Sequence, residues 1–259
     1  MAIESFIISR DDTVYECFPH LCRTHTGRVL LVYRESNGHV ASEFCRVIVR
    51  YSDDAGHTWT DRHVLIDEDR STGILTTWNG PKIQQLEDGR ILLLCESYDY
   101  PPGEWGVEDR ARVSLWFSDD DGRSFSGPQP TSVGGICPDQ VTQMPDGRWL
   151  LPTNLRLHDA DRLTQVLWVS NDEGATWDGG TPMNEDPDHD LDEASIVRMP
   201  GGELVSYERE DLGRPLQKLI SRDGGRTWEG PYSTLNPAAI GMPIAGLTQD
   251  GHVLITGRY

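Results

Sequence analysis

The chain has 259 residues, with 42 acidic and 23 basic side chains that give a formal net charge of −19 at pH 7. A surface this acidic repels phosphate backbones and anionic lipids, so we expect neither a nucleic-acid partner nor a membrane-surface role. Hydrophobic residues make up 37% of the chain, enough for a packed core, and no apolar run approaches the roughly 20 residues that span a bilayer.

The N-terminal residues lack a basic head and an apolar signal core, which predicts an intracellular, cytoplasmic location. The 5 cysteines are an odd number without C-x-x-C spacing, so we expect reduced thiols. The acidic run 186–193 lacks the glycine and the spacing of a calcium-binding loop. We therefore expect no metal and no cofactor.

Along the chain, one order of elements recurs: a turn glycine, an apolar strand, a second strand and then an eight-residue box. The turn glycines precede the apolar runs 28–34, 90–96, 148–154, 203–209 and 252–258. The boxes share the form S-x-D-x-G-x-[ST]-[WF] and span Ser52–Trp59, Ser118–Phe125, Ser170–Trp177 and Ser221–Trp228.

Each piece of this repeat predicts a β-hairpin. A turn glycine between two apolar runs allows the positive φ that a tight reversal needs. In the box, the Ser and Asp side chains bond the amides of their own turn, and the aromatic residue closes it as an apolar plug. With about four strands in each unit and no amphipathic helix between units, the sequence predicts an all-β protein, a β-propeller of four-stranded blades.

The boxes resemble the Asp-boxes, or BNR repeats, of the sialidase (neuraminidase) superfamily, and the resemblance covers nearly the whole chain as one domain, residues 1–259. Propellers of that family have six blades, whereas this chain has four complete units and a fifth that begins at Gly251. The resemblance implies a propeller whose last blades are incomplete. A five-bladed ring closed by the segment Glu4–Ser9 is the alternative.

The strand count places the turn glycines and the boxes at one end of each blade, and any pocket at the opposite end. Seven residues past the turn glycines, at that opposite end, stand Arg34, Glu96, Asn154, Arg209 and Arg258, with Arg156 two residues beyond Asn154. Guanidinium groups bind carboxylates in bidentate fashion, so gathered arginines predict a pocket for an anionic sugar. The alternative is that they are solvated or paired with acidic neighbours.

The starts of the first strands supply the other wall of this expected pocket. There, Asn79 and Asp139, together with Glu96 and Asn154, are candidates to bind sugar hydroxyls. The segment that begins at Glu193 resembles the sialidase segment in which a glutamate polarises a nucleophilic tyrosine and an arginine closes the hairpin. The resemblance implies these roles for Glu193 and Arg209, with Arg258 as a further arginine of the substrate-binding triad. Alternatively, Glu193 is an acidic loop residue.

The chain departs from the family pattern at three points. Cys17-Phe18-Pro19 replaces the Arg-Ile-Pro motif, so that arginine is absent, and Arg34 is a candidate to supply its charge. The loop 34–44 has no aspartate, which leaves His39 as a candidate general acid/base, because imidazole titrates near neutrality. The alternative for His39 is a loop histidine without chemistry. The nucleophilic tyrosine is expected beyond residue 259.

These residues predict a sialidase-type (exo-α-sialidase) glycoside hydrolase that acts on a carboxylate-bearing sugar. A propeller polysaccharide lyase that acts on uronic acids is the first alternative, because some such lyases use Arg, His and Tyr. A non-catalytic carbohydrate-binding propeller is the second. In all three, the expected partner is a carbohydrate.

Overall fold

A computed structural model describes residues 5–100, 110–156, 163–234 and 239–258. The chain divides into two units, and each is described by itself. The N-terminal unit comprises residues 1–107 and 115–128, and the C-terminal unit comprises residues 108–114 and 129–259. The segment Glu4–Ser9 begins at a residue outside the described part of the chain.

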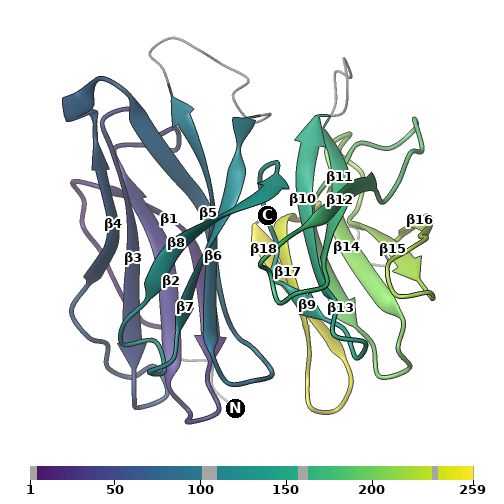
Figure 1. The fold of residues 1–259 in the computed structure, drawn as a ribbon, viewed down its shortest axis with the longest axis horizontal. Helices are drawn as coiled ribbons and strands as arrows, with labels where there is room; N and C mark the ends of the chain where they lie inside the picture. Colours follow the sequence, from purple (N-terminus) through teal and green to yellow (C-terminus); the bar gives the residue numbers. More distant parts are fainter. Residues whose placement is uncertain (1–4, 101–109, 157–162, 235–238, 259) are drawn as a thin grey trace. The chain divides into compact units, whose positions relative to one another are not determined.

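The described residues form antiparallel sheets whose strands follow one another in chain order (Figure 1). The first sheet holds β1 (Tyr15–Arg23), β2 (Val29–Ser36), β3 (Phe44–Ser52) and β4 (His63–Asp69), and the second holds β5 (Leu75–Gln85), β6 (Ile91–Tyr100), β7 (Arg112–Ser118) and β8 (Ser126–Gly134). The third holds β9 (Thr142–Gln143), β10 (Trp149–Arg156), β11 (Leu163–Ser170) and β12 (Asp178–Pro182), and the fourth holds β13 (Leu191–Arg198), β14 (Leu204–Glu210), β15 (Gln217–Ser221) and β16 (Glu229–Ser233). The fifth is the pair β17 (Gly241–Leu247) and β18 (Val253–Arg258), and the one described helix is the 3-10 turn η1 (Arg70–Thr72). The predicted all-β architecture of four-stranded propeller blades is confirmed.

The boxes fold into the same hydrogen-bonded turn between the third and fourth strands of a blade. In the first, Ser52 Oγ donates to Asp54 Oδ1 over 2.7 Å and accepts from the Gly56 amide over 2.8 Å. The Thr58 amide donates to Asp54 Oδ1 over 2.8 Å, and Trp59 Nε1 donates to the Gly56 carbonyl over 2.9 Å. The hydroxyl and amide of Thr58 lower the pKa of Asp54 to about 2. Because these donors favour the ionised form, the hydroxyl and amide groups of a box stabilise the negative charge of its own aspartate.

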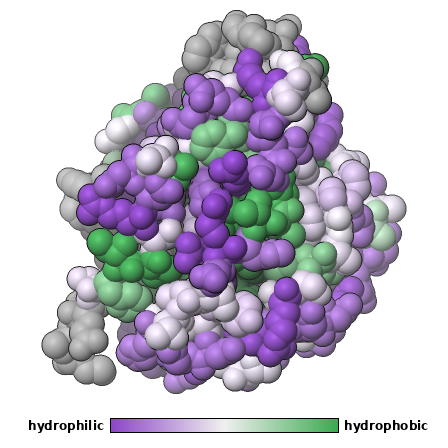
Figure 2. All heavy atoms as spheres, turned by 90° about the vertical axis from the view of Figure 1, so that its left-hand side faces the viewer, coloured by the Kyte–Doolittle hydropathy of each residue, from purple (hydrophilic) through white to green (hydrophobic). Residues whose placement is uncertain are grey.

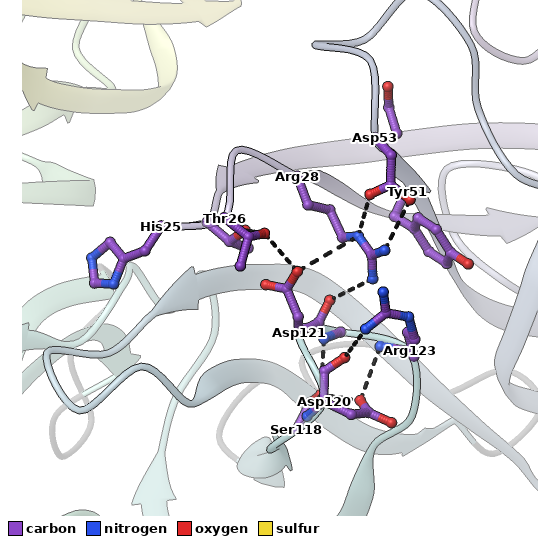
Figure 3. Close-up of polar contacts among 12 residues, drawn as sticks. His25, Thr26, Arg28, Tyr51, Asp53, Ser118, Asp120, Asp121 and Arg123 are labelled. Atoms are coloured by element: carbon purple, nitrogen blue, oxygen red, sulfur yellow. Dashed lines mark hydrogen bonds and ion pairs between the residues drawn. The ribbon is translucent and has the colours of Figure 1, made fainter.

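A buried arginine joins two of these boxes within the N-terminal unit (Figure 3). The side chain of Arg28 is 3% exposed and donates from Nε and Nη2 to Asp53 over 2.7 and 2.9 Å. Its Nη1 donates to the Asp121 carbonyl over 3.0 Å, and its guanidinium lies 4.0 Å from the centre of the Tyr51 ring. Thr26 Oγ1 donates to the Asp121 carboxylate over 2.7 Å. The first and second blades are therefore locked together at their box ends.

The first strands β1, β5, β13 and β17 carry a β-bulge near the end that lies opposite the turn glycine, with a residue of positive φ at Phe18 (54°), Gly80 (55°), Glu193 (45°) and Met242 (50°). In the third blade, Cys137 has a positive φ (52°) before β9 begins. The register shifts at the four bulges, so that two residues oppose one on the second strand. The residues just before these bulges pair with the strand ends Arg34, Glu96, Arg209 and Arg258, and Ile136 forms a bridge with Asn154. The predicted equivalence of these five strand ends is confirmed.

The core lies along the first three strands of the blades. In the N-terminal unit it includes Leu30, Val47 and Leu93, and in the C-terminal unit it includes Leu150 and Leu204. The face drawn in Figure 2 is mostly hydrophilic, with apolar side chains in smaller areas between polar ones. In the part of the chain that the structure describes, no helix has the length and apolar character to cross a membrane.

Candidate functional site

Three of the predicted site residues meet in the C-terminal unit, around the carboxylate of Glu193. Its Oε2 accepts from the Met242 amide over 2.7 Å and lies 3.1 Å from Arg209 Nη1. Its Oε1 lies 3.9 Å from Arg258 Nη2. The Glu193 side chain is 9% exposed, whereas those of Arg209 and Arg258 are 34% and 57% exposed. A buried carboxylate thus sits beside two guanidinium groups that a ligand can reach.

The backbone explains why these three side chains converge. Arg209 and Arg258 occupy equivalent ends of β14 and β18, opposite the residues that precede the bulges of β13 and β17. Glu193 is itself the bulge residue of β13, and its φ of 45° takes it out of the regular strand conformation. The position of the bulge therefore places Glu193 beside Arg209, which belongs to the same hairpin, and beside Arg258, which belongs to the next hairpin.

A pocket of about 330 Å³ opens beside this cluster. Its lining residues are Arg209, Glu210, Asp211, Gly213, Ala239, Ile240, Gly241 and Arg258. Gly241 matters for the shape of this wall, since a Cβ atom there would lie 3.2 Å from Arg258 Nη2 and 3.6 Å from Glu193 Oε2. The volume of the pocket is within the size range of small-ligand sites.

Acidic neighbours surround Arg209. Its Nε lies 2.7 Å from Asp211 Oδ1, and Asp192 pairs with it across the β13–β14 ladder. Burial opposes the charge of Arg209, but the carboxylates of Glu193 and Asp192 outweigh that effect and raise its pKa. Burial, followed by the charges of Glu193 and Asp211, raises the pKa of Asp192 to about 8. The site therefore combines a permanently charged guanidinium with a carboxyl group that is mostly neutral at pH 7.

Polar side chains of the third blade hold the bulge of β13 in place. Asn154 Oδ1 accepts from the Glu193 amide over 3.3 Å, and Gln165 Oε1 accepts from the Ala194 amide over 3.3 Å. Asp139 Oδ2 accepts from the Ile196 amide over 2.9 Å. Asn154 and Asp139 were expected to bind sugar hydroxyls, and the contacts seen here position the strand that carries Glu193. Asn154 and Asp139 are 0% and 4% exposed.

Arg156 is half-buried at the end of β10. Sequence reasoning assigned no role to three residues of the site: Gln165, Asp192 and Asp211. The repeat pattern could have identified Asp192, because this residue occupies the position that pairs with a strand-end arginine. Gln165 and Asp211 carry no comparable signal in the sequence.

Other predicted residues form a separate group in the N-terminal unit, centred on Arg34. Its side chain is almost fully buried, with the residue 1% exposed. Nη1 donates to Asn79 Oδ1 over 2.6 Å, and Asn79 Nδ2 donates to Glu96 Oε1 over 2.9 Å. Nη2 donates to the carbonyls of Gly38 and His39 over 3.1 and 2.6 Å. Arg34 therefore fixes the loop that presents His39.

The His39 side chain is exposed and lies against two aromatic rings. Its ring centroid is 5.7 Å from that of Phe18 and 6.2 Å from that of Tyr15. The Arg34 guanidinium lies 5.0 Å from the centre of the Phe18 ring. Cys17 pairs with Arg34 in the ladder, and burial raises the pKa of its thiol to about 11 although Arg34 opposes the rise. The Arg34 charge therefore lies beside the position where the family resemblance implies an arginine.

The described residues contain no group of three or more His, Cys, Asp or Glu side chains placed to hold a metal ion. The family model of the BNR repeat-like domain matches residues 46–256. The chain belongs to the BNR repeat-like domain family. It is therefore a member of the sialidase and BNR-repeat propeller superfamily.

Known relatives of this BNR repeat-like protein include a sialidase of Paraclostridium sordellii, 27% identical over 233 residues. That match covers 78% of the chain and 56% of the sialidase, so the chain spans about half the length of this curated relative. A protein of unknown function from Dyadobacter fermentans has a similar structure, with a TM-score of 0.80 and 21% identity over 98% of this chain and 78% of that one. A Hadza microbial sialidase has a TM-score of 0.74 and 20% identity, over 93% of this chain and 52% of that one. These likenesses show the fold.

Proposed function

We propose that this BNR repeat-like protein is a sialidase-type glycoside hydrolase that acts on a carboxylate-bearing sugar. The observation that carries the proposal is the Glu193 carboxylate beside the Arg209 and Arg258 guanidinium groups, at the edge of a pocket of about 330 Å³. A guanidinium has five N–H donors, so Arg209 binds its acidic neighbours and still has donors for a ligand. The identity to a sialidase supports the same reading.

In this proposal, Arg209 and Arg258 hold the carboxylate of the sugar, which orients the anomeric carbon. Glu193 polarises the attacking nucleophile, and the Met242 amide fixes its carboxylate by a 2.7 Å hydrogen bond. In the N-terminal unit, His39 stays a predicted general acid/base, since it is an exposed imidazole on a loop that Arg34 holds by two carbonyls.

The test is release of methylumbelliferone from a methylumbelliferyl sialoside. We expect Glu193→Ala to lose at least ~100-fold in kcat/KM, the scale of a lost catalytic group. The matched control is Glu185→Gln, an exposed glutamate of the same unit, which should keep the wild-type rate. Equal rates for Glu193→Ala and the wild type would refute the role of Glu193. No release from any sialoside would refute the sialidase proposal.

One observation favours a second candidate, a polysaccharide lyase that acts on uronic acids. His39 and Tyr15 are both exposed, and their ring centroids are 6.2 Å apart. In a lyase, an arginine neutralises the uronate while His and Tyr transfer the proton. The product is an unsaturated sugar that absorbs in the near ultraviolet, and His39→Ala should abolish it. Calorimetric sugar binding without either product would indicate a non-catalytic carbohydrate-binding propeller.

A further inference from the structure

The acidic groups around Arg209 outnumber the arginines that pair with them. Four carboxyl groups act on this part of the C-terminal unit: Asp190, Asp192, Glu193 and Asp211. Arg209 makes ion pairs with Glu193 and Asp211, at 3.1 and 2.7 Å. Arg258, at 3.9 Å, also pairs with Glu193. Four carboxylates face two guanidinium groups when Asp192 is ionised and three face two when it is neutral, so ionisation of Asp192 adds a negative charge that weakens the attraction of the arginines for an anionic ligand.

Asp192 takes part in none of these ion pairs. It is 7% exposed and lies on the same face of the β13–β14 ladder as its pairing partner Arg209. Its Oδ1 atom is buried, and the described residues give it no hydrogen-bond partner. A buried carboxylate without donors is costly, whereas a neutral carboxyl in the same place is not.

The groups that face Asp192 come from a few elements. On its own strand and just before it are Glu193 and Asp190, and on β14 and the turn that follows are Arg209 and Asp211. The strands β9, β10, β11 and β17 also pack against β13. The only ionisable side chain that they carry is Arg156 of β10. β14 also carries Glu210 and the buried Glu208, which lies opposite the bulge of β13, and Asp139 accepts from the Ile196 amide of β13 over 2.9 Å.

We propose that Asp192 controls whether this pocket takes an anion: the pocket binds a sugar carboxylate while the Asp192 carboxyl is neutral and releases it when that carboxyl ionises. The inference rests on the proposed function for its choice of ligand class. Burial and the neighbouring carboxylates, which raise the pKa of Asp192 to about 8, place this change just above neutral pH.

The expected size follows from linkage between proton and ligand. If only the neutral form of Asp192 binds the ligand, the affinity is nearly constant below pH 7 and falls above it. Between pH 7 and pH 9 the dissociation constant then rises about tenfold. A ligand without charge has no such dependence, because ionisation of Asp192 does not repel it.

Calorimetric titration of the full chain tests this, with N-acetylneuraminic acid and D-glucuronic acid as carboxylate probes and glucose as the neutral control, at pH 6, 7, 8 and 9. The wild type should lose about tenfold in affinity for the bound carboxylate probe between pH 7 and pH 9. D192N should show a flat profile and should still bind at pH 9. The matched control D178N, at an exposed aspartate of the same unit, should follow the wild type.

A wild-type affinity that is the same at pH 7 and pH 9, or a D192N profile that falls as steeply as the wild type, overturns the inference. If D192N does not fold by circular dichroism, the wild-type profile and carbon-13 NMR of labelled aspartate carboxyl groups decide. The inference is overturned if none of the aspartate carboxyl groups titrates above pH 7. Turnover is measured separately. If the protein binds the carboxylate probe in a pH-dependent way but has no turnover, only the proposed hydrolase function is refuted. If it binds no carboxylate probe at any pH, the inference about Asp192 is overturned.

Discussion

Glu208 makes the stability of this protein depend on pH in a direction opposite to that of most acidic side chains. It lies on β14, opposite the bulge of β13, and is 0% exposed. Ser206 Oγ donates to its Oε1 over 2.7 Å, whereas its Oε2 has no hydrogen-bond partner among the described residues. Burial raises the pKa of Glu208 from 4.5 to about 7, although Ser206 opposes the rise.

The magnitude follows from this pKa difference. Below pH 4.5, Glu208 is protonated in both the folded and the unfolded chain, so it has no effect. As the pH rises from 4.5 to about 7, the unfolded chain releases the proton and the folded chain keeps it, so folding becomes progressively less favourable. The loss reaches about 1.4 kcal/mol at pH 5.5 and about 3 kcal/mol at pH 8, where it has levelled off.

Glu208→Gln removes the ionisation and keeps the shape of the side chain. Relative to the wild type, its free energy of unfolding should be about 2 kcal/mol larger at pH 8 than at pH 5.5, so the variant is relatively more stable at the higher pH. Urea unfolding followed by tryptophan fluorescence measures this difference, which does not depend on how well glutamine itself fits. Glu203→Gln, at a side chain 38% exposed beside the same strand, serves as the control for replacing a glutamate of this blade with glutamine. A Glu208→Gln effect that is equal at the two pH values would refute the reasoning.

Two pairs of glycines give matched tests of packing. Gly122 and Gly89 have φ of +78° and +94°, but an added Cβ would lie 2.6 Å from a buried leucine side chain only at Gly122. In urea unfolding we expect Gly122→Ala to be about 1–3 kcal/mol less stable than Gly89→Ala, and equal stabilities would contradict the packing argument. In β17, a Cβ at Gly241 would lie 3.2 Å from Arg258 Nη2, whereas one at Gly246 would meet nothing within 4 Å. Gly241→Ala should weaken binding of N-acetylneuraminic acid by a factor of about 10 with Gly246→Ala unchanged, and the reverse order in calorimetry would rule out Gly241 as part of the pocket wall.

The fold was predictable because its signals are local and repeated. A glycine of positive φ and an Asp-centred box lie within a few residues of the strands that they join, so each repeat reports its own hairpin. Because neighbouring strands of a blade are antiparallel, the number of strands between two turns then determines which turns lie at the same end of the blade. In the third blade, for example, Trp149 at the start of β10 pairs with Ser170 at the start of the box, as the strand count requires.

The site was predictable only where it follows from that register. Arg209 and Arg258 share a position in the repeat, and both contact Glu193. The burial of Arg34 under the 38–39 loop was not predictable, because it depends on how that loop folds back on β2. The neutral state of Asp192 was equally hidden, since it arises from the sum of several nearby charges and from burial.

The fourth blade shows how a shared backbone feature acquires chemistry at one place. In four of the five repeats, the residue of positive φ that corresponds to Glu193 is followed by a proline: Pro19, Pro81, Pro138 and Pro243. In the fourth repeat, alanine takes this place, and the Ala194 amide donates to Gln165 Oε1. Proline has no amide hydrogen, so it cannot make this bond. Together with the bond from the Glu193 amide to Asn154, the Ala194 bond anchors the bulge on both sides of the Glu193 side chain. The fourth blade, which has Ala194 in place of proline, is therefore the one in which the Glu193 side chain lies beside two arginines. The Ala194 amide supplies a hydrogen bond that keeps the bulge, and with it Glu193, in that position.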